Sequence, residues 1–151
     1  MNKEAKKNAY LYCKFRDEQF ALYDAYAKKH GIMMKTLLVV NALFYAKQGM
    51  TQTQLCQRTF QSKQTVNLIM KKLLQDGHVR LEEDVHDHRH KLVYMTSSGR
   101  THYEQVVRHI TWAEDTAMAM LAPEEQRRLI DLSRTFSENL AKLVWQKEEK
   151  E

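Results

Sequence analysis

The sequence is poor in residues that interrupt regular structure or crosslink a chain. Its 151 residues include only four glycines, one proline and two cysteines. So few glycines and prolines leave no flexible linker and no low-complexity tract, and we expect a single domain over residues 1–151. Cys13 and Cys56 stand far apart, which excludes a disulfide framework and a zinc-type C-x-x-C pair. We therefore expect reduced thiols and no bound metal.

A long apolar run is also missing. The most apolar stretch, residues 32–46, is interrupted by Lys35, Thr36 and Asn41, and it is too short and too polar to span a bilayer. No apolar segment of a signal peptide follows the lysine-rich residues 1–7. These features predict a cytoplasmic protein with no membrane partner.

Catalytic signatures are absent as well. The sequence contains no glycine-rich phosphate loop, no nucleophile elbow and no H-E-x-x-H motif, so we expect no enzyme and no cofactor. The formal net charge is +5, from 24 lysines and arginines against 19 aspartates and glutamates. This excess favours a polyanionic partner, although the position of the charges matters more than their sum.

The four glycines and the single proline divide the chain into segments, most of which are helical. Residues 5–30 carry apolar side chains at helical spacing, and residues 32–46 are typical of a buried helix. Residues 97–147 contain two further helices, with Pro123 suited to the first turn of the last one. That last helix places Leu129, Phe136 and Leu143 at heptad spacing.

Two short helices occupy the middle of the chain. Thr51 and Gln54 form the pattern of a capping box for the first helix, and Ser62 caps the second. We expect Phe60, in the turn between them, to plug the core. The second helix turns an apolar face inward through Val66, Ile69, Met70 and Leu73, so its outer face carries Gln64, Asn67, Leu68 and Lys71, with Lys63 at the edge.

A hairpin follows this pair of helices. Residues 79–83 and 91–95 have the length and composition of strands, and the charged loop between them contains Arg89. A helix that presents amides and cations, next to a β-ribbon that presents an arginine, is suited to binding a nucleic-acid duplex. We therefore predict a mainly α fold with a small β-hairpin wing, its winged head spanning about residues 32–99.

Several sequence motifs resemble those of the MarR family of bacterial transcriptional regulators. The wing matches the family pattern D-x-x-D-x-R through Asp84, Asp87 and Arg89. Residues 95–99 resemble its L-T-x-x-G, and residues 121–124 resemble the start of its last helix. The run Ser62-Lys63-Gln64-Thr65-Val66, followed by Leu73, Gly77 and Val79, is similar to its recognition helix. The order and spacing of these motifs match from about residue 31 to residue 143.

The resemblance implies a winged helix-turn-helix protein that controls transcription as a homodimer on a pseudo-palindromic operator. It implies double-stranded DNA as partner, with contacts from Thr51, Ser62, Lys63, Gln64, Thr65, Asn67, Leu68, Lys71, Arg80, Asp87, Arg89 and Lys91. It also implies that long helices at about 5–30 and 97–147 form the dimer, through Leu11, Phe15, Leu129, Leu132, Phe136, Leu140 and Leu143. Finally, it implies release from DNA by a small-molecule effector or by thiol oxidation.

Other interpretations compete at three places. The wing histidines His86, His88 and His90 alternate as metal ligands would, but no further ligand framework stands nearby, so we expect no metal there. Cys13 is the candidate redox thiol, although its sequence surroundings differ from those of thiol sensors. Glu82 and Glu83 near the wing favour a winged-helix protein-interaction module without DNA binding as the alternative function.

Overall fold

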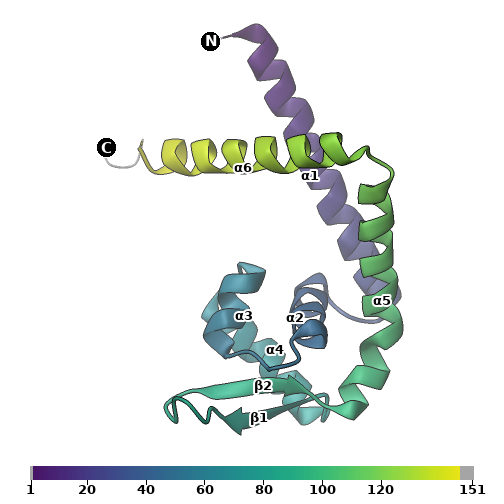
Figure 1. Cartoon of the computed structure of the whole chain (residues 1–151), viewed down its shortest axis with the longest axis vertical. Helices are drawn as coiled ribbons and strands as arrows, with labels where there is room; N and C mark the ends of the chain where they lie inside the picture. The colour runs from purple at the N-terminus through teal and green to yellow at the C-terminus, as the bar shows by residue number, and fades with distance from the viewer. Residues whose placement is uncertain (1, 147–151) are drawn as a thin grey trace. The chain divides into compact units, whose positions relative to one another are not determined.

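The computed structural model describes residues 2–146, which form six helices and a two-stranded antiparallel hairpin (Figure 1). In chain order the elements are α1 (Lys3–Lys29), α2 (Met34–Tyr45), α3 (Gln52–Thr59), α4 (Lys63–Gln75), β1 (Val79–Glu83), β2 (Lys91–Met95), α5 (Ser97–Ala119) and α6 (Pro123–Gln146). The predicted mainly α fold with a hairpin wing is confirmed. Residue 1 and residues 147–151, the ends of the predicted domain and of its last helix, lie outside the described residues.

The chain forms two compact units that divide within α5, after Arg108. The first unit contains α1 to α4, the hairpin and the start of α5. The second contains the end of α5 and α6. No helix in residues 2–146 is long and apolar enough to cross a membrane.

The helix boundaries around the central turn follow from local hydrogen bonds. Thr51 and Gln54 make both halves of a capping box, with Gln54 N–H donating to Thr51 Oγ1 at 3.1 Å and Thr51 N–H donating to Gln54 Oε1 at 2.9 Å. Ser62 Oγ accepts from Thr65 N–H at 3.1 Å and so caps α4. These caps fix where the two short helices begin.

The prediction that Phe60 plugs the core is wrong. Phe60 closes α3 in a left-handed conformation, with φ of 54°, and its ring is 95% exposed. The core position under this turn belongs to Leu55, which is fully buried. The left-handed turn needed to pass from α3 to α4 therefore leaves the aromatic ring at the surface.

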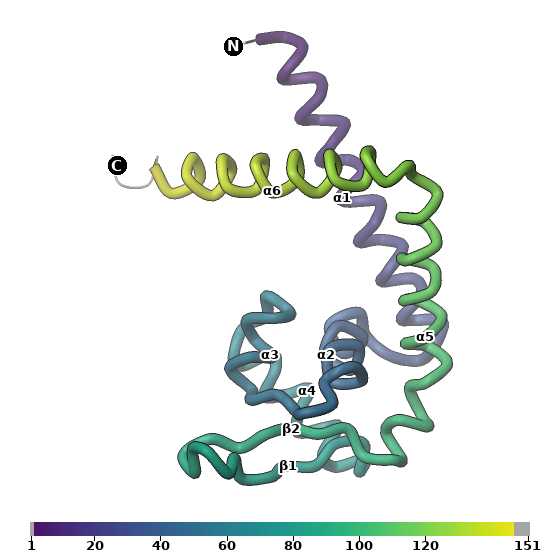
Figure 2. Tube along the Cα trace, viewed as in Figure 1, coloured from purple at the N-terminus to yellow at the C-terminus, as the bar shows by residue number. Residues whose placement is uncertain are grey.

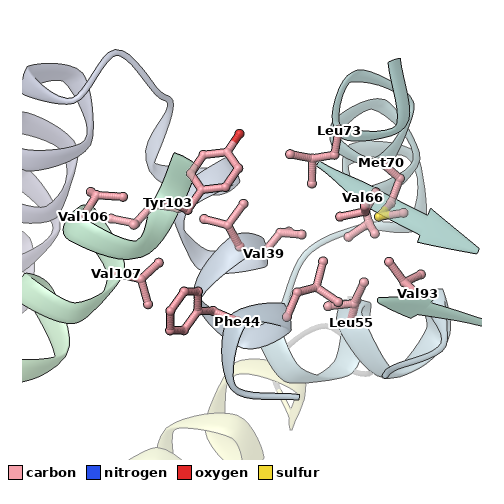
Figure 3. Packing of buried hydrophobic residues seen from close by; sticks show 14 of the residues in the cluster. Val39, Phe44, Leu55, Val66, Met70, Leu73, Val93, Tyr103, Val106 and Val107 are labelled. Carbon is pink, nitrogen blue, oxygen red and sulfur yellow. The ribbon is translucent and has the colours of Figure 1, made fainter. Parts of the chain in front are cut away.

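One apolar core holds the winged head together. Figure 3 shows Val39 and Phe44 of α2 between the α5 side chains Tyr103, Val106 and Val107 on one side and the α3, α4 and β2 side chains on the other. All of the labelled residues are buried. Within α2 only Lys35 and Tyr45 are exposed, so this helix serves as the central helix of the head.

The hairpin has the predicted strands, and one residue that precedes α3 also pairs with β2. Val79 pairs with Met95, and Glu83 pairs with Lys91, so the tip spans residues 84–90 (Figure 2). Met50, just before α3, exchanges two backbone hydrogen bonds with Val93, at 3.1 and 2.7 Å. A single bridging residue has no sequence periodicity, which explains why this anchor of the wing was not predicted.

The second unit carries an unusual amount of exposed apolar surface. Pro123 begins α6 as predicted, and Glu125 Oε1 accepts from Ala122 N–H at 3.1 Å at the helix start. None of the residues in α6 is buried, although the helix carries seven large apolar residues that are more than 40% exposed: Leu129, Ile130, Leu132, Leu140, Leu143, Val144 and Trp145. An exposed apolar surface of this extent is typical of an interaction site.

Candidate nucleic-acid interface

The outer face of α4 presents one continuous set of polar and basic side chains. Val66, Met70 and Leu73 are buried, which fixes the rotation of the helix about its axis. The opposite face is exposed and consists of Lys63, Gln64, Asn67, Leu68 and Lys71, as the sequence predicted. Leu68 stands out because it is apolar and 71% exposed. A leucine held in solvent among donors and cations is suited to contact a thymine methyl group.

Three of the predicted contact residues already use their hydroxyls in hydrogen bonds at the two helix starts. Ser62 Oγ also donates to Thr65 Oγ1 at 2.8 Å, and Thr51 Oγ1 caps α3. These side chains define the backbone at the two helix starts. Their contacts with DNA stay predictions, and the geometry gives each of them a structural role in the turn as well.

Asn67 is held by a residue that the sequence reasoning missed. Gln52, the first residue of α3, donates from Nε2 to Asn67 Oδ1 at 2.7 Å. The two residues stand fifteen positions apart on different helices, so no local pattern connects them. Only the packing of α3 against α4 brings them together.

The wing tip is ordered around Asp87. Its carboxylate accepts from Arg89 backbone N–H at 3.1 Å, from Nε at 3.0 Å and from Nη2 at 3.2 Å. The side-chain hydrogen bonds from Arg89, and then its backbone hydrogen bond, lower the pKa of Asp87 below its usual value. Since the Arg89 side chain is 87% exposed, Asp87 orients the guanidinium without covering it.

The acidic residues beside the wing are partly neutralised. Arg80 pairs with Glu82, and its guanidinium lies 4.6 Å from the centre of the Tyr94 ring. Lys91 stands opposite Glu83 in the hairpin register. The two glutamates that favoured a protein-interaction module therefore each face a cation from the same hairpin.

The wing histidines are spread around acidic side chains. His88 Nδ1 lies 3.8 Å from Glu83, and His90 Nε2 lies 3.5 Å from Asp87. Within residues 2–146, no three histidine, cysteine, aspartate or glutamate side chains are grouped so that they could hold a metal ion.

A compact junction connects the end of α4 to the start of α5. The rings of His78 and His102 stack with their centres 4.4 Å apart, and His78 Nδ1 lies 3.2 Å from the Tyr103 hydroxyl. Burial, followed by the proximity of His102, lowers the pKa of His78, and the neutral imidazole is favoured. The backbone is tied here too, since His78 C=O accepts from Thr96 N–H at 3.0 Å.

The predicted dimer and redox residues occupy the remaining helices. On α1, Leu11 is 38% exposed and Phe15 is 57% exposed, while Cys13 is half-buried. On α6, Phe136 is half-buried and the four leucines are exposed. Dimerisation through these side chains and oxidation of Cys13 stay predictions.

Comparisons with known proteins agree on one family. Residues 36–90, which contain the helix-turn-helix and the first part of the wing, match the model described as the MarR family. No curated protein sequence matches the chain. Among solved structures, a MarR family regulator from Neisseria meningitidis is 18% identical, with 97% of this chain and 99% of that chain covered and a TM-score of 0.76.

Two further solved structures show the same fold. AbsC, a MarR family transcriptional regulator from Streptomyces coelicolor, is 18% identical over 93% of this chain and 97% of its own, with a TM-score of 0.76. The MepR–DNA complex from Staphylococcus aureus is 20% identical over 87% of this chain and 96% of its own, with a TM-score of 0.67.

Proposed function

We propose that this chain is a MarR family protein and a homodimeric repressor of transcription that binds a pseudo-palindromic operator in double-stranded DNA. The observation that carries the proposal is the exposed face of α4, where the buried side chains force two lysines, two amides and a leucine outward together. A helix of this kind fits the major groove, whose width admits an α-helix. We expect Arg89, which Asp87 orients, to contact the minor groove beside that helix.

The phosphate contacts give the most direct test. Lys63→Ala and Lys71→Ala should each weaken binding to all duplexes by a similar factor, because lysine contacts phosphate as a point charge. Each lost contact should reduce the slope of log K against log salt by about 0.9. Fluorescence anisotropy with a labelled operator and with random duplex, from low to moderate salt, measures both effects.

Lys7, exposed on α1, provides the control. Lys7→Ala should leave the salt slope unchanged. If the slopes of both α4 variants also stayed unchanged, the proposed contacts would be wrong. If the unaltered chain bound no duplex at all, a protein-interaction module would become the better explanation of the winged head.

The wing gives a second test. Arg89→Ala should lower operator affinity at least tenfold, about 1.4 kcal/mol, because the guanidinium is always charged and can lie flat in a narrow groove. The triple change of His86, His88 and His90 to alanine should cost much less. Circular dichroism would verify that both variants keep the wild-type fold. A metal chelator should have no effect, whereas loss of binding in the histidine variant alone would identify the wing as a metal-sensing element.

We propose that the dimer forms through α1, α5 and α6. The support is the apolar surface of α6, which no side chain of residues 2–146 buries, together with the exposed Phe15 and Leu11 of α1. A homodimer would place two recognition helices on two half-sites, and this arrangement matches a two-fold symmetric operator.

We propose an aromatic acid or phenol as the effector. A groove of roughly 710 Å³ lies beside α2, and its lining includes the aromatic residues Phe20, Tyr45 and Phe60 and the cations Lys35 and Arg58. Two acceptors in it, Asn41 Oδ1 and Gln61 Oε1, are buried with no hydrogen-bond donor among the described residues. A ligand with an aromatic body, a hydroxyl and an anionic group would match these aromatic residues, acceptors and cations.

We propose oxidation of Cys13 as a second event that could release the protein from DNA.

Benzoate and 2-hydroxybenzoate serve as probes of the effector groove. Either should raise the thermal unfolding midpoint and weaken operator binding, and the hydroxylated compound should act at the lower concentration because it can donate to a buried acceptor. Asn41→Leu, which removes one acceptor at similar volume, should abolish the advantage of the hydroxyl. Equal responses of the two proteins to both compounds would contradict this assignment.

A further inference from the structure

We propose that Gln52 determines which base Asn67 reads, by holding the Asn67 carbonyl so that the amide presents its N–H donors to the DNA. The inference rests on the proposed function, since it concerns the same α4 face. It assigns to α3 a role in sequence preference, through a residue that lies outside the recognition helix. Gln52 is thus a positioning residue for Asn67.

The geometry constrains both partners. Gln52 directly follows Thr51, whose capping box with Gln54 fixes the backbone at the start of α3. Asn67 follows Val66, which is fully buried against the core with Leu55 of α3. With both backbones fixed, the 2.7 Å hydrogen bond between Gln52 Nε2 and Asn67 Oδ1 sets the orientation of an otherwise exposed amide.

The engaged oxygen changes the chemistry that Asn67 offers. An unconstrained asparagine pairs with adenine in two bonds, because Oδ1 accepts from adenine N6 while Nδ2 donates to N7. In this structure Gln52 already donates to Oδ1, so that oxygen is engaged and its orientation is set by a residue of the protein rather than by a base. The part of the amide that is left without a hydrogen bond among the described residues is the Nδ2 group, which has two donors and no acceptor.

Among the four bases, guanine suits two donors best. Its major-groove edge presents two acceptors, N7 and O6, whereas adenine presents one acceptor and one donor, and cytosine presents a donor. Placing Asn67 Nδ2 against the adenine amino group would set donor against donor. We therefore expect guanine to be preferred over adenine at the base that Asn67 contacts.

The test compares base preferences rather than affinities alone. Operators selected from a random pool by the unaltered chain would define the site, and all four bases would then be measured at each position of the half-site. The unaltered chain should prefer guanine over adenine by about tenfold at one position, in the range that a good bidentate contact gives. Gln52→Ala should reduce this preference to about twofold or less, because Asn67 is released.

Gln52→Glu gives a sharper prediction. Glutamate has the same length but can only accept, so it would bind Asn67 Nδ2 and turn Oδ1 outward. The preference should move toward adenine or cytosine, whose edges carry donors. Gln57→Glu, on the exposed face of the same helix, controls for the added negative charge and should lower affinity without changing the base profile.

Asn67→Ala completes the set. It should remove the guanine preference of the unaltered chain and also the shifted preference of Gln52→Glu, since both are exerted through Asn67. If the Gln52 variants lowered affinity equally for all bases, Asn67 would contact the backbone and the inference would be wrong while the proposed function stood. If the unaltered chain bound no duplex, the proposed function would fail, and this inference with it.

Discussion

Gly99→Ala is expected to destabilise the winged head by about 3 kcal/mol or more. Gly99 is buried in the first turn of α5, and a Cβ added there would lie 2.1 Å from the carbonyl oxygen of His78 and 2.8 Å from its carbonyl carbon. These are backbone atoms, so no side-chain rotation can relieve the overlap. Overpacking in a core typically costs about 1–3 kcal/mol, and a forced backbone shift belongs at the upper end or beyond.

The backbone that would have to move is itself held from both sides. His78 N–H donates to Leu73 C=O at 2.9 Å, and His78 C=O accepts from Thr96 N–H at 3.0 Å. Moving this carbonyl would break a bond that joins the end of α4 to the start of α5. Because a domain of this size is stable by only about 5–15 kcal/mol, the loss should also reduce the amount of folded protein in cells.

Urea unfolding followed by circular dichroism measures the effect, and Gly77→Ala is the matched control. Gly77 has a φ of +72°, and a Cβ there would meet no atom within 4 Å. That variant should lose only the free energy needed to hold an alanine in the left-handed conformation, about 1–2 kcal/mol. A smaller loss for Gly99→Ala than for Gly77→Ala would show that the junction yields easily, contrary to this expectation.

The Gly99 contact also shows what sequence could and could not predict. The L-T-x-x-G pattern placed a glycine three residues after Thr96, and the structure supplies the reason: the helix start must pass directly against a backbone carbonyl. Capping residues and strand limits were predictable because their signals lie within four or five neighbouring residues. Thr51, Ser62 and the strands 79–83 and 91–95 belong to this group.

Features that depend on tertiary packing were not predictable in the same way. The Met50–Val93 bridge and the Gln52–Asn67 hydrogen bond each join residues far apart in sequence, with no periodic signal. Phe60 was misassigned because aromatic residues are usually buried, whereas here the left-handed turn decides its position. For the candidate site, the outer face of α4 followed from helical periodicity, but the orientation of Asn67 on that face did not.

The double change Leu140→Glu and Leu143→Glu is expected to convert the proposed dimer into a monomer. At 100° per residue, these two positions share one stripe of α6 with Leu129, Leu132 and Phe136. Leu140 is 44% exposed and Leu143 is 63% exposed, so burial between two copies would remove most of their remaining surface from water. Each fully buried leucine contributes about 1.5–3 kcal/mol, and a symmetric interface would contain four of them.

Loss of the dimer should also weaken operator binding strongly. Two linked recognition helices bind two half-sites with an avidity gain of about 10²–10⁴, and a monomer forfeits that gain without losing any contact of its own head. The double variant should therefore elute as a folded monomer in size-exclusion chromatography with light scattering. Its affinity for a single half-site should stay close to that of the unaltered chain, while its affinity for the full operator falls by at least a hundredfold.

A flank of α6 outside the stripe supplies a control of equal charge. Thr135→Glu with Lys142→Gln also changes the net charge by two units, but these positions lie away from the apolar stripe. This control should remain dimeric and bind the full operator normally. If both double variants remained dimers, α6 would not form the interface, and the apolar stripe would need a different partner. If both became monomers, charge rather than apolar burial would govern the association, because only one of the pairs removes leucines from the stripe.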